Sequence, residues 1–258
     1  MHPDAYTSLA AMEQVGWYYQ ARARCLQRLV ERFVVTDGKP LEILDVGCGT
    51  GGTSAALTRF GHVVGLEPSE LALRLLQERH PELDVVPGAV ADVDVLFPGE
   101  HFDLATIMGV LYHRDVADPA ESLRKVRSVL RPGGWLIWNE GVYPILARTH
   151  DEFVEAGRRF RPSEMRALLV GAGFRVRFAS HLLGWAFPIA LALALSHRAR
   201  RTLFGPQRYA NHVSDDRPLP RVVNAALREL TYLEWACSLR HLKAPVGVAY
   251  LTIAQSTK

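Results

Sequence analysis

The sequence predicts one α/β domain built around a mostly parallel β-sheet with helices on both faces. Short apolar runs alternate with helical patterns from Leu41 to Glu140, and such alternation implies parallel strands joined by right-handed crossovers. The chain has 258 residues, of which 48% are hydrophobic and 22% charged. This composition is sufficient for one large core and argues against extended disorder.

The predicted elements follow one another in a regular order. We expect strands at 41–46, 62–67, 83–87, 102–108 and 134–140, and helices at about 52–60, 69–79 and 117–130. A sixth strand is expected from Phe174 to Ala179 and a seventh from Val246 to Ala254. Ligands of such sheets bind beyond the carboxyl ends of the strands, where Asp45, Glu67 and Met108 fall.

The single domain divides into four segments. Residues 1–38 should form N-terminal cap helices, since apolar residues after Arg24 repeat at helical spacing. Residues 39–180 form the core, and 246–258 contain the final strand. Residues 181–245 form a helical insert between the last two strands, which we expect to be a lid over the substrate side or a dimer interface.

The insert has two apolar stripes, 182–195 and 219–237, separated by the polar loop 205–218. The first stripe has fourteen residues and includes Pro188, so it falls short of the roughly 20 apolar residues that span a bilayer. A buried helix is the favoured interpretation. Two alternatives remain: an apolar entrance for a hydrophobic substrate, or a shallow membrane contact next to the basic residues 197–201.

The charge and cysteine content set further limits. The net charge is +3, and the sequence shows no basic arm or RNA-binding signature, so we expect no nucleic-acid partner. Three widely spaced cysteines indicate a reducing compartment. The residues after Met1 lack the basic segment and apolar run that are typical of a secretory signal peptide. We therefore expect a cytoplasmic protein, monomeric or homodimeric.

A glycine-rich turn follows the first predicted strand. Gly47, Gly49 and Gly52 satisfy the pattern G-x-G-x-x-G, which is typical of dinucleotide sites. Side chains at Gly47 or Gly49 would occupy the space of a bound ligand, and the helix beginning near Thr53 presents unpaired N–H groups to it. Taken alone, the pattern allows NAD or a flavin.

The neighbouring residues resemble another family. Leu44–Gly51 resembles the first motif of class I S-adenosylmethionine (SAM) dependent methyltransferases, and four later segments resemble its other motifs in order: Val63–Glu67, Phe102–Met108, Leu130–Leu136 and Leu168–Phe174. The resemblance implies a Rossmann-like domain with seven strands, the last antiparallel, and methyl transfer to a small molecule in bacterial specialised or cell-surface metabolism. S-adenosylhomocysteine would be the product. An NAD-dependent oxidoreductase leaves Leu130–Leu136 unexplained, and a non-catalytic SAM-binding protein is a third reading.

The resemblance also implies a set of cofactor residues. Asp45 would hold the ammonium group, Glu67 would accept the ribose hydroxyls, and Met108 would lie against the adenine or methylthio group. The complete predicted set consists of Tyr19, Arg24, Asp45, Gly47, Cys48, Gly49, Glu67, Pro68, Ala89, Val90, Met108 and Gly109. Family members often carry Asp where this chain has Ala89, so the contact to the exocyclic amine is in doubt. Asp92 is a candidate substitute.

The segment from Glu13 to Arg24 resembles that of a methyltransferase subgroup with the pattern Glu-x-x-His-Trp-Trp-Tyr followed by arginines. The matching residues are Glu13, Trp17, Tyr19, Arg22 and Arg24, whereas Gly16 and Tyr18 depart from the pattern. In that subgroup the segment closes over the cofactor, and an arginine meets its carboxylate. An amphipathic helix with a solvated basic face is the plainer alternative.

The candidates for chemistry follow the fourth and fifth strands. His113 has the residue type suited to a general base near neutral pH, and capping the next helix is an equally weighted alternative. Tyr112 is the second catalytic candidate. The candidate substrate-binding residues are Trp17, Tyr18, Tyr143 and His150. The sequence shows no metal-ligand spacing, and a nucleophilic substrate would need no base.

Overall fold

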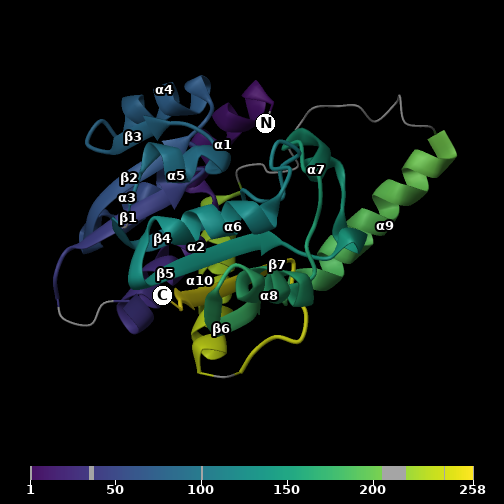
Figure 1. Ribbon diagram of the computed structural model, residues 1–258. Helices are drawn as coiled ribbons and strands as arrows, with labels where there is room; N and C mark the ends of the chain where they lie inside the picture. The colour runs from purple at the N-terminus through teal and green to yellow at the C-terminus, as the bar shows by residue number, and fades with distance from the viewer. Residues whose placement is uncertain (1, 35–37, 100, 205–218, 241, 258) are drawn as a thin grey trace.

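The computed structural model describes residues 2–34, 38–99, 101–204, 219–240 and 242–257. A twisted seven-stranded sheet crosses the molecule in the order β3-β2-β1-β4-β5-β7-β6 (Figure 1). The strands are β1 Leu41–Val46, β2 Gly61–Glu67, β3 Asp84–Pro87, β4 Phe102–Met108, β5 Leu130–Gly141, β6 Phe174–Leu182 and β7 Ala249–Ser256.

The strand directions confirm the predicted fold class. β7 is antiparallel to β5 and to β6, whereas the other neighbouring strands are parallel. β5 begins at Leu130, so its first residues, through Gly133, lie in a strand and not in the predicted helix end and turn. β7 begins at Ala249, three residues later than predicted. Parallel strands place their carboxyl ends, including Val46 and Met108, at one edge of the sheet.

Two hydrophobic cores lie on the two faces of the sheet. Side chains of successive strand residues point to opposite faces, so Ile43 enters one core and Leu44 the other. Helices α6 (Pro119–Ser128) and α8 (Pro162–Gly171) cover the Leu44 face. Helix α2 (Trp17–Leu29) and the π-helix η1 (Val30–Val34) cover the Ile43 face. Figure 1 shows α6 and α8 in front of the sheet and α2 behind it.

The insert between β6 and β7 is helical, as predicted, and consists of α9 (Phe187–Phe204) and α10 (Arg221–Leu239). The second predicted apolar stripe is largely exposed on α10, where Val222 is 82%, Leu230 44% and Leu233 59% exposed, so the described part of the chain leaves it open to another partner. Helix α10 packs against α2 through a different face, and its Trp235, 4% exposed, belongs to the same core as α2. Helix α2 leaves part of that sheet face for α10 to complete.

Helix α9 projects from the end of the sheet and contacts the short helix η4 (Pro144–Leu146) (Figure 1). Ala194 is its buried point, whereas Ile189, Leu193 and Leu195 are about half exposed. No described helix combines the length and the apolar character that a bilayer crossing requires. The loop 205–218, predicted to be mobile, lies outside the described residues.

Candidate functional site

The glycine turn connects β1 with helix α3 (Gly52–Leu57) and is fixed against β2. The N–H groups of Gly47 and Cys48 donate to the carbonyl oxygen of Leu66 at 2.7 and 3.1 Å. Gly47 has φ +69°, which favours glycine, and a Cβ atom there would collide with Val110 of the loop after β4. Glycine at this position therefore lets the β1 turn and the β4 loop approach each other.

Asp45 lies beneath the turn and is 1% exposed. Its carboxylate oxygens accept hydrogen bonds from the hydroxyls of Ser54 and Thr106, both at 2.7 Å. Burial raises the pKa of Asp45 to about 6, and the two hydroxyl donors oppose that increase. The structure thus gives Asp45 the role of joining α3 to β4, and its contact with the cofactor ammonium stays a prediction.

Glu67 ends β2 and is 4% exposed, while the adjacent Pro68 is exposed. Its Oε2 accepts from the N–H of Gly49 at 3.0 Å, and its Oε1 accepts from the N–H of Ser69 at 3.0 Å and the Tyr6 hydroxyl at 3.2 Å. Burial raises the pKa of Glu67, and these donors oppose that increase. A carboxylate fixed to the glycine turn receives a hydroxyl donor, the chemical group that a ribose presents.

Helix α1 (Pro3–Val15) lies over the turn. Its Glu13 accepts from the Thr50 hydroxyl at 2.7 Å and from the N–H of Gly52, the first residue of α3, at 3.2 Å. Arg79 of α4 (Glu70–Arg79) lies 3.1 Å from the same carboxylate. Glu13 therefore satisfies free donors at the start of α3, and α1 covers the expected binding region.

The arginine that faces the turn is Arg22, not the predicted Arg24. Nη2 of Arg22 lies 3.3 Å from the hydroxyl of Thr53, and its guanidinium lies 5.2 Å from the ring centroid of the predicted Tyr19. Arg24 points to α10, where it pairs with Glu229 at 2.9 Å and stacks 3.6 Å from the ring centroid of Tyr232. The two arginines are two residues apart on α2 and so cannot share one helix face.

The predicted adenine side is formed by the loops after β3 and β4. Val90 is buried in the turn η3 (Val90–Asp92), and Met108 is 9% exposed at the end of β4. Gly109 continues with φ +79°. The carboxylate of Asp92 accepts from the N–H of Ala89 at 3.2 Å. Asp92 thus already accepts a hydrogen bond from the backbone of this turn. Its contact with the adenine amine, in place of the Asp that family members carry at position 89, stays a prediction.

The two catalytic candidates lie in the loop after β4 and are both shielded. The rings of Tyr112 and His113 are 4.3 Å apart, and His113 forms an isolated backbone bridge with Ala156. Burial lowers the pKa of His113 to about 4. A histidine of that kind is neutral near pH 7 but is a weak proton acceptor, so the geometry favours a structural role over general-base catalysis.

Sequence reasoning missed Glu140, a fully buried carboxylate at the end of β5. Its Oε1 accepts from the N–H groups of Val110 and Leu111 at 3.2 and 2.8 Å and from the indole of Trp138 at 2.9 Å. Its Oε2 is buried with no hydrogen-bond partner among the described residues. Burial raises the pKa of Glu140 to about 7. Glu140 thus fixes the loop that carries Tyr112.

The predicted substrate residues divide into two groups. The ring centroids of Trp17 and Trp185 are 5.6 Å apart, and those of Trp17 and Tyr18 are 5.9 Å apart. The backbone N–H of Trp17 donates to the side-chain oxygen of Asn224 on α10 at 2.8 Å. The insert therefore meets the N-terminal aromatic segment, although Trp185 and Asn224 were not predicted as site residues. Only the position of the insert in space identifies them.

Tyr143 and His150 belong to the second group, beyond β5. Tyr143 has φ +64° and places its hydroxyl 2.7 Å from Nε2 of His181 on β6. His150 lies in α7 (Thr149–Phe153), whose Phe153 packs against Ala5 of α1. Tyr143 is thus held by β6, whereas Trp17 is held by α10.

These arrangements match the comparisons with known proteins. Residues 43–134 match a family model described as a methyltransferase domain. The chain therefore carries a methyltransferase domain over these residues, within a Rossmann-like methyltransferase fold. The cofactor of this family is SAM, and the glycine turn with the hydroxyl-accepting Glu67 fits its ribose and amino-acid parts.

The proteins similar to this chain are named for different activities. The chain is 34% identical over 104 residues to the ubiquinone biosynthesis O-methyltransferase of Albidiferax ferrireducens, covering 38% of this chain and 40% of that protein. It is 38% identical over 104 residues to the tRNA U34 carboxymethyltransferase of Shewanella sediminis, covering 37% and 30%. The chain thus spans less than half the length of these two relatives, so substrate and whole-protein activity are proposals.

A solved structure supports the fold over the whole chain. The Haloferax volcanii complex of the Trm112 methyltransferase activator with a methyltransferase has a TM-score of 0.60 and 20% identity, covering 99% of this chain and 96% of that one. Identity at this level shows the fold alone. Among the described residues, no three His, Cys, Asp or Glu side chains gather as metal ligands would.

Proposed function

We propose that this protein is a cytoplasmic SAM-dependent methyltransferase that acts on a small-molecule acceptor in bacterial specialised or cell-surface metabolism. The observation that carries the proposal is Glu67, a buried carboxylate bonded to the glycine turn and to a hydroxyl. SAM supplies an activated methyl group. The protein has to hold the acceptor in line with it, and positioning alone can supply about 7–11 kcal/mol of the barrier.

The residues of this chain divide that work. Glu67 accepts the ribose hydroxyls, and the turn from Gly47 to Gly52 offers backbone N–H groups to the amino-acid part. Arg22 provides a positive charge at the start of α3 for the carboxylate of the cofactor. Glu140 holds the β4 loop in place. Helix α1 covers the turn and excludes water, which strengthens these electrostatic contacts.

A small apolar or aromatic acceptor fits the surroundings better than RNA does. The aromatic rings of Trp17, Tyr18 and Trp185 line the junction of the N-terminal segment and the insert. Such rings bury large apolar area and keep a polar edge. The relative named for ubiquinone biosynthesis supports a small-molecule acceptor. The relative named for tRNA makes RNA the competing acceptor.

Titration calorimetry with S-adenosylhomocysteine tests cofactor binding. Glu67→Ala removes a charged hydrogen-bond acceptor, which contributes about 1.5–3 kcal/mol, so affinity should fall about tenfold to a hundredfold. Glu70→Ala, at an exposed position three residues later, is the matched control and should leave affinity unchanged. An unchanged affinity in Glu67→Ala, or tighter binding of NAD than of S-adenosylhomocysteine, contradicts the proposal.

Native mass spectrometry of the purified protein tests the acceptor. Carried-over SAM or S-adenosylhomocysteine is expected together with a compound of low mass. A co-purifying RNA that gains a methyl group from labelled SAM would replace the small-molecule acceptor by RNA and leave the cofactor assignment standing.

A further inference from the structure

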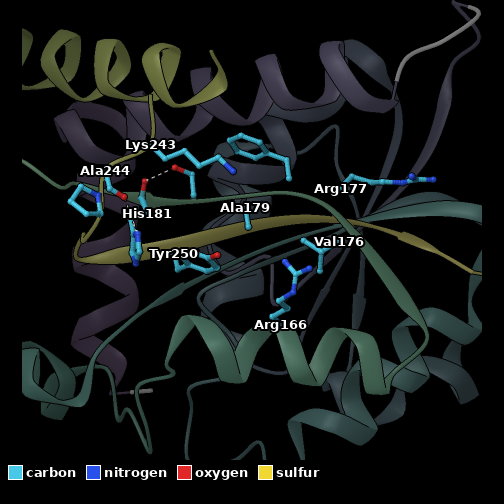
Figure 2. A pocket seen from close by; sticks show the side chains of 11 residues that line it. Arg166, Val176, Arg177, Ala179, His181, Lys243, Ala244 and Tyr250 are labelled. Carbon is cyan, nitrogen blue, oxygen red and sulfur yellow. Dashed lines mark hydrogen bonds between the residues drawn. The ribbon is translucent and has the colours of Figure 1, made fainter. Parts of the chain in front are cut away.

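A groove runs along the outer edge of the sheet, away from the glycine turn. β6 is the terminal strand of the sheet, so one side of its backbone has no neighbouring described strand. Beside it is a cavity of about 440 Å³ lined by residues of α8, β6, β7 and the segment before β7 (Figure 2). Unpaired strand edges offer N–H and C=O groups to an added strand.

The groove is lined by positive side chains from both sides of the sheet. Figure 2 shows Arg166 of α8 on one side of the two strands and Lys243 on the other. Arg166 acts electrostatically on Tyr250, whose ring packs against the core on the α6 and α8 face. Nζ of Lys243 lies 4.7 Å from the ring centroid of Phe178, which belongs to the opposite core.

These charges lack acidic partners within the described part of the chain. Arg177 donates to the neutral amide oxygen of Gln255 at 3.1 and 2.7 Å, and neither Arg166 nor Lys243 forms an ion pair with a described residue. None of the described lining residues is Asp or Glu. An anionic ligand would therefore meet positive charge without displacing an internal carboxylate.

His181 lines the groove and joins two of the elements beside it. A carbonyl can only accept, so Nδ1–H of His181 donates to the carbonyl oxygen of Ala244 at 3.1 Å, and its Nε2 accepts from the hydroxyl of Tyr143 at 2.7 Å. These bonds fix the segment before β7 against the strand. The groove thus has one rigid wall that carries Lys243.

We propose that this groove binds an extended acidic segment of a partner protein, which adds to the sheet alongside β6. Successive side chains of a strand point to opposite faces, so two adjacent acidic residues would reach Arg166 and Lys243, one on each face. A second copy of this chain fits poorly, because self-pairing would bring Arg175 and Arg177 against like charges.

Charged residues on edge strands also prevent aggregation. That purpose needs charge on the strand itself, which Arg175 and Arg177 provide. Arg166 and Lys243 come from other elements and lie across the groove, so protection alone does not explain them. Binding to the groove is independent of the proposed methyl transfer.

Fluorescence anisotropy can test the proposal on the full-length protein. The probe is a fluorescein-labelled peptide, Thr-Val-Thr-Glu-Glu-Thr-Val-Thr, in buffer of low ionic strength. We expect saturable one-to-one binding that Arg166→Ala and Lys243→Ala each weaken about two- to fivefold, the range that exposed ion pairs support. The double charge reversal Arg166→Glu with Lys243→Glu should weaken it at least tenfold. The matched control is Arg74→Glu on α4, at the other end of the sheet, which should change affinity less than twofold.

Two further probes distinguish the occupants. A peptide with proline in place of the central threonines keeps its charge but loses backbone donors, and it should bind at least fivefold more weakly. Equal binding of this peptide, or full competition by millimolar phosphate, would show an anion site without strand addition and overturn the proposal. Absence of binding, preference for an RNA oligonucleotide, or dimerisation that the double variant abolishes would also overturn it.

Discussion

At the residue scale, sequence reasoning located Glu67 and the glycine turn because both depend on local chain chemistry. A strand that ends in a carboxylate and a turn that needs positive φ are visible in the order of the residues. Arg22 and Arg24 both matched the subgroup pattern, and Arg24 was predicted for the cofactor because the sequence does not show which side of α2 packs toward the turn. Glu140 was missed because its partners Val110 and Leu111 lie about thirty positions away and meet it only in the folded chain.

Glu140 should make the stability of the protein depend on pH. Its folded pKa is raised from 4.5 to about 7, so between these values the folded state binds more protons than the unfolded state. The free energy of unfolding contributed by Glu140 therefore falls as pH rises from 4.5 to 7. Glu140→Gln removes this loss, and its stability relative to the native protein should increase by about 3 kcal/mol over that window.

Urea denaturation of both proteins at several pH values measures this difference. Taking the difference between the two proteins cancels the contribution of His113, whose lowered pKa acts in the opposite direction. A constant difference between pH 4.5 and 7 would show that the Glu140 carboxylate is as well stabilised as it is in water.

His113 should stay neutral well below the pH at which a solvated histidine gains its proton. Burial lowers its pKa to about 4, whereas the hydrogen bonds that His62 donates to the carboxylates of Asp84 and Glu42 raise the pKa of His62 above its usual value of 6.5. Proton NMR titration of the two imidazoles, assigned with His113→Gln and His62→Gln, should separate them by more than two pH units. A titration of His113 near pH 6.5 would restore it as a general-base candidate.

At the element scale, the positions of strands and helices were predictable because apolar periodicity reports them directly. The location of α10 was not. The apolar stripe predicted at 219–237 is largely exposed, and α10 packs against α2 and the core through a different face, which carries Trp235. The position of α1 was not predictable either: its Tyr6 donates to Glu67, and its Glu13 accepts from the residues at the start of α3.

Glu13 should stabilise the start of α3. Its carboxylate accepts from Gly52 and Thr50 and pairs with Arg79 in a nearly buried setting. Losing a helix cap costs about 0.5–2 kcal/mol, so Glu13→Ala should lower the free energy of unfolding by about that amount. Chemical denaturation with Glu78→Ala, at an exposed position on α4, as the control measures this. If the two variants lose equal stability, the cap contributes nothing specific.

At the scale of the whole molecule, the sheet divides the protein into a cofactor end around β1 and β4 and an outer edge at β6. The predicted lid has to act at the first of these. Helix α1 is the element that covers the turn, through Tyr6 on Glu67 and Glu13 on the start of α3. A ribose that bonds to Glu67 would share this carboxylate with the Tyr6 hydroxyl, so we expect cofactor binding to rearrange α1.

Hydrogen exchange measured by mass spectrometry can locate the moving element. Adding S-adenosylhomocysteine should change exchange most in residues 3–15 and in the turn at 47–52, and least in the half of α10 near Trp235, which is already held in the core. Tyr6→Phe, which keeps the ring but cannot donate to Glu67, should speed exchange in residues 3–15 before ligand is added. If protection of α10 falls on dilution, its exposed face is a dimer interface. If exchange in α9 changes only with lipid vesicles, α9 contacts membranes, and if α9 and α10 respond to the ligand more than α1 does, the insert is the lid and α1 is a fixed cover.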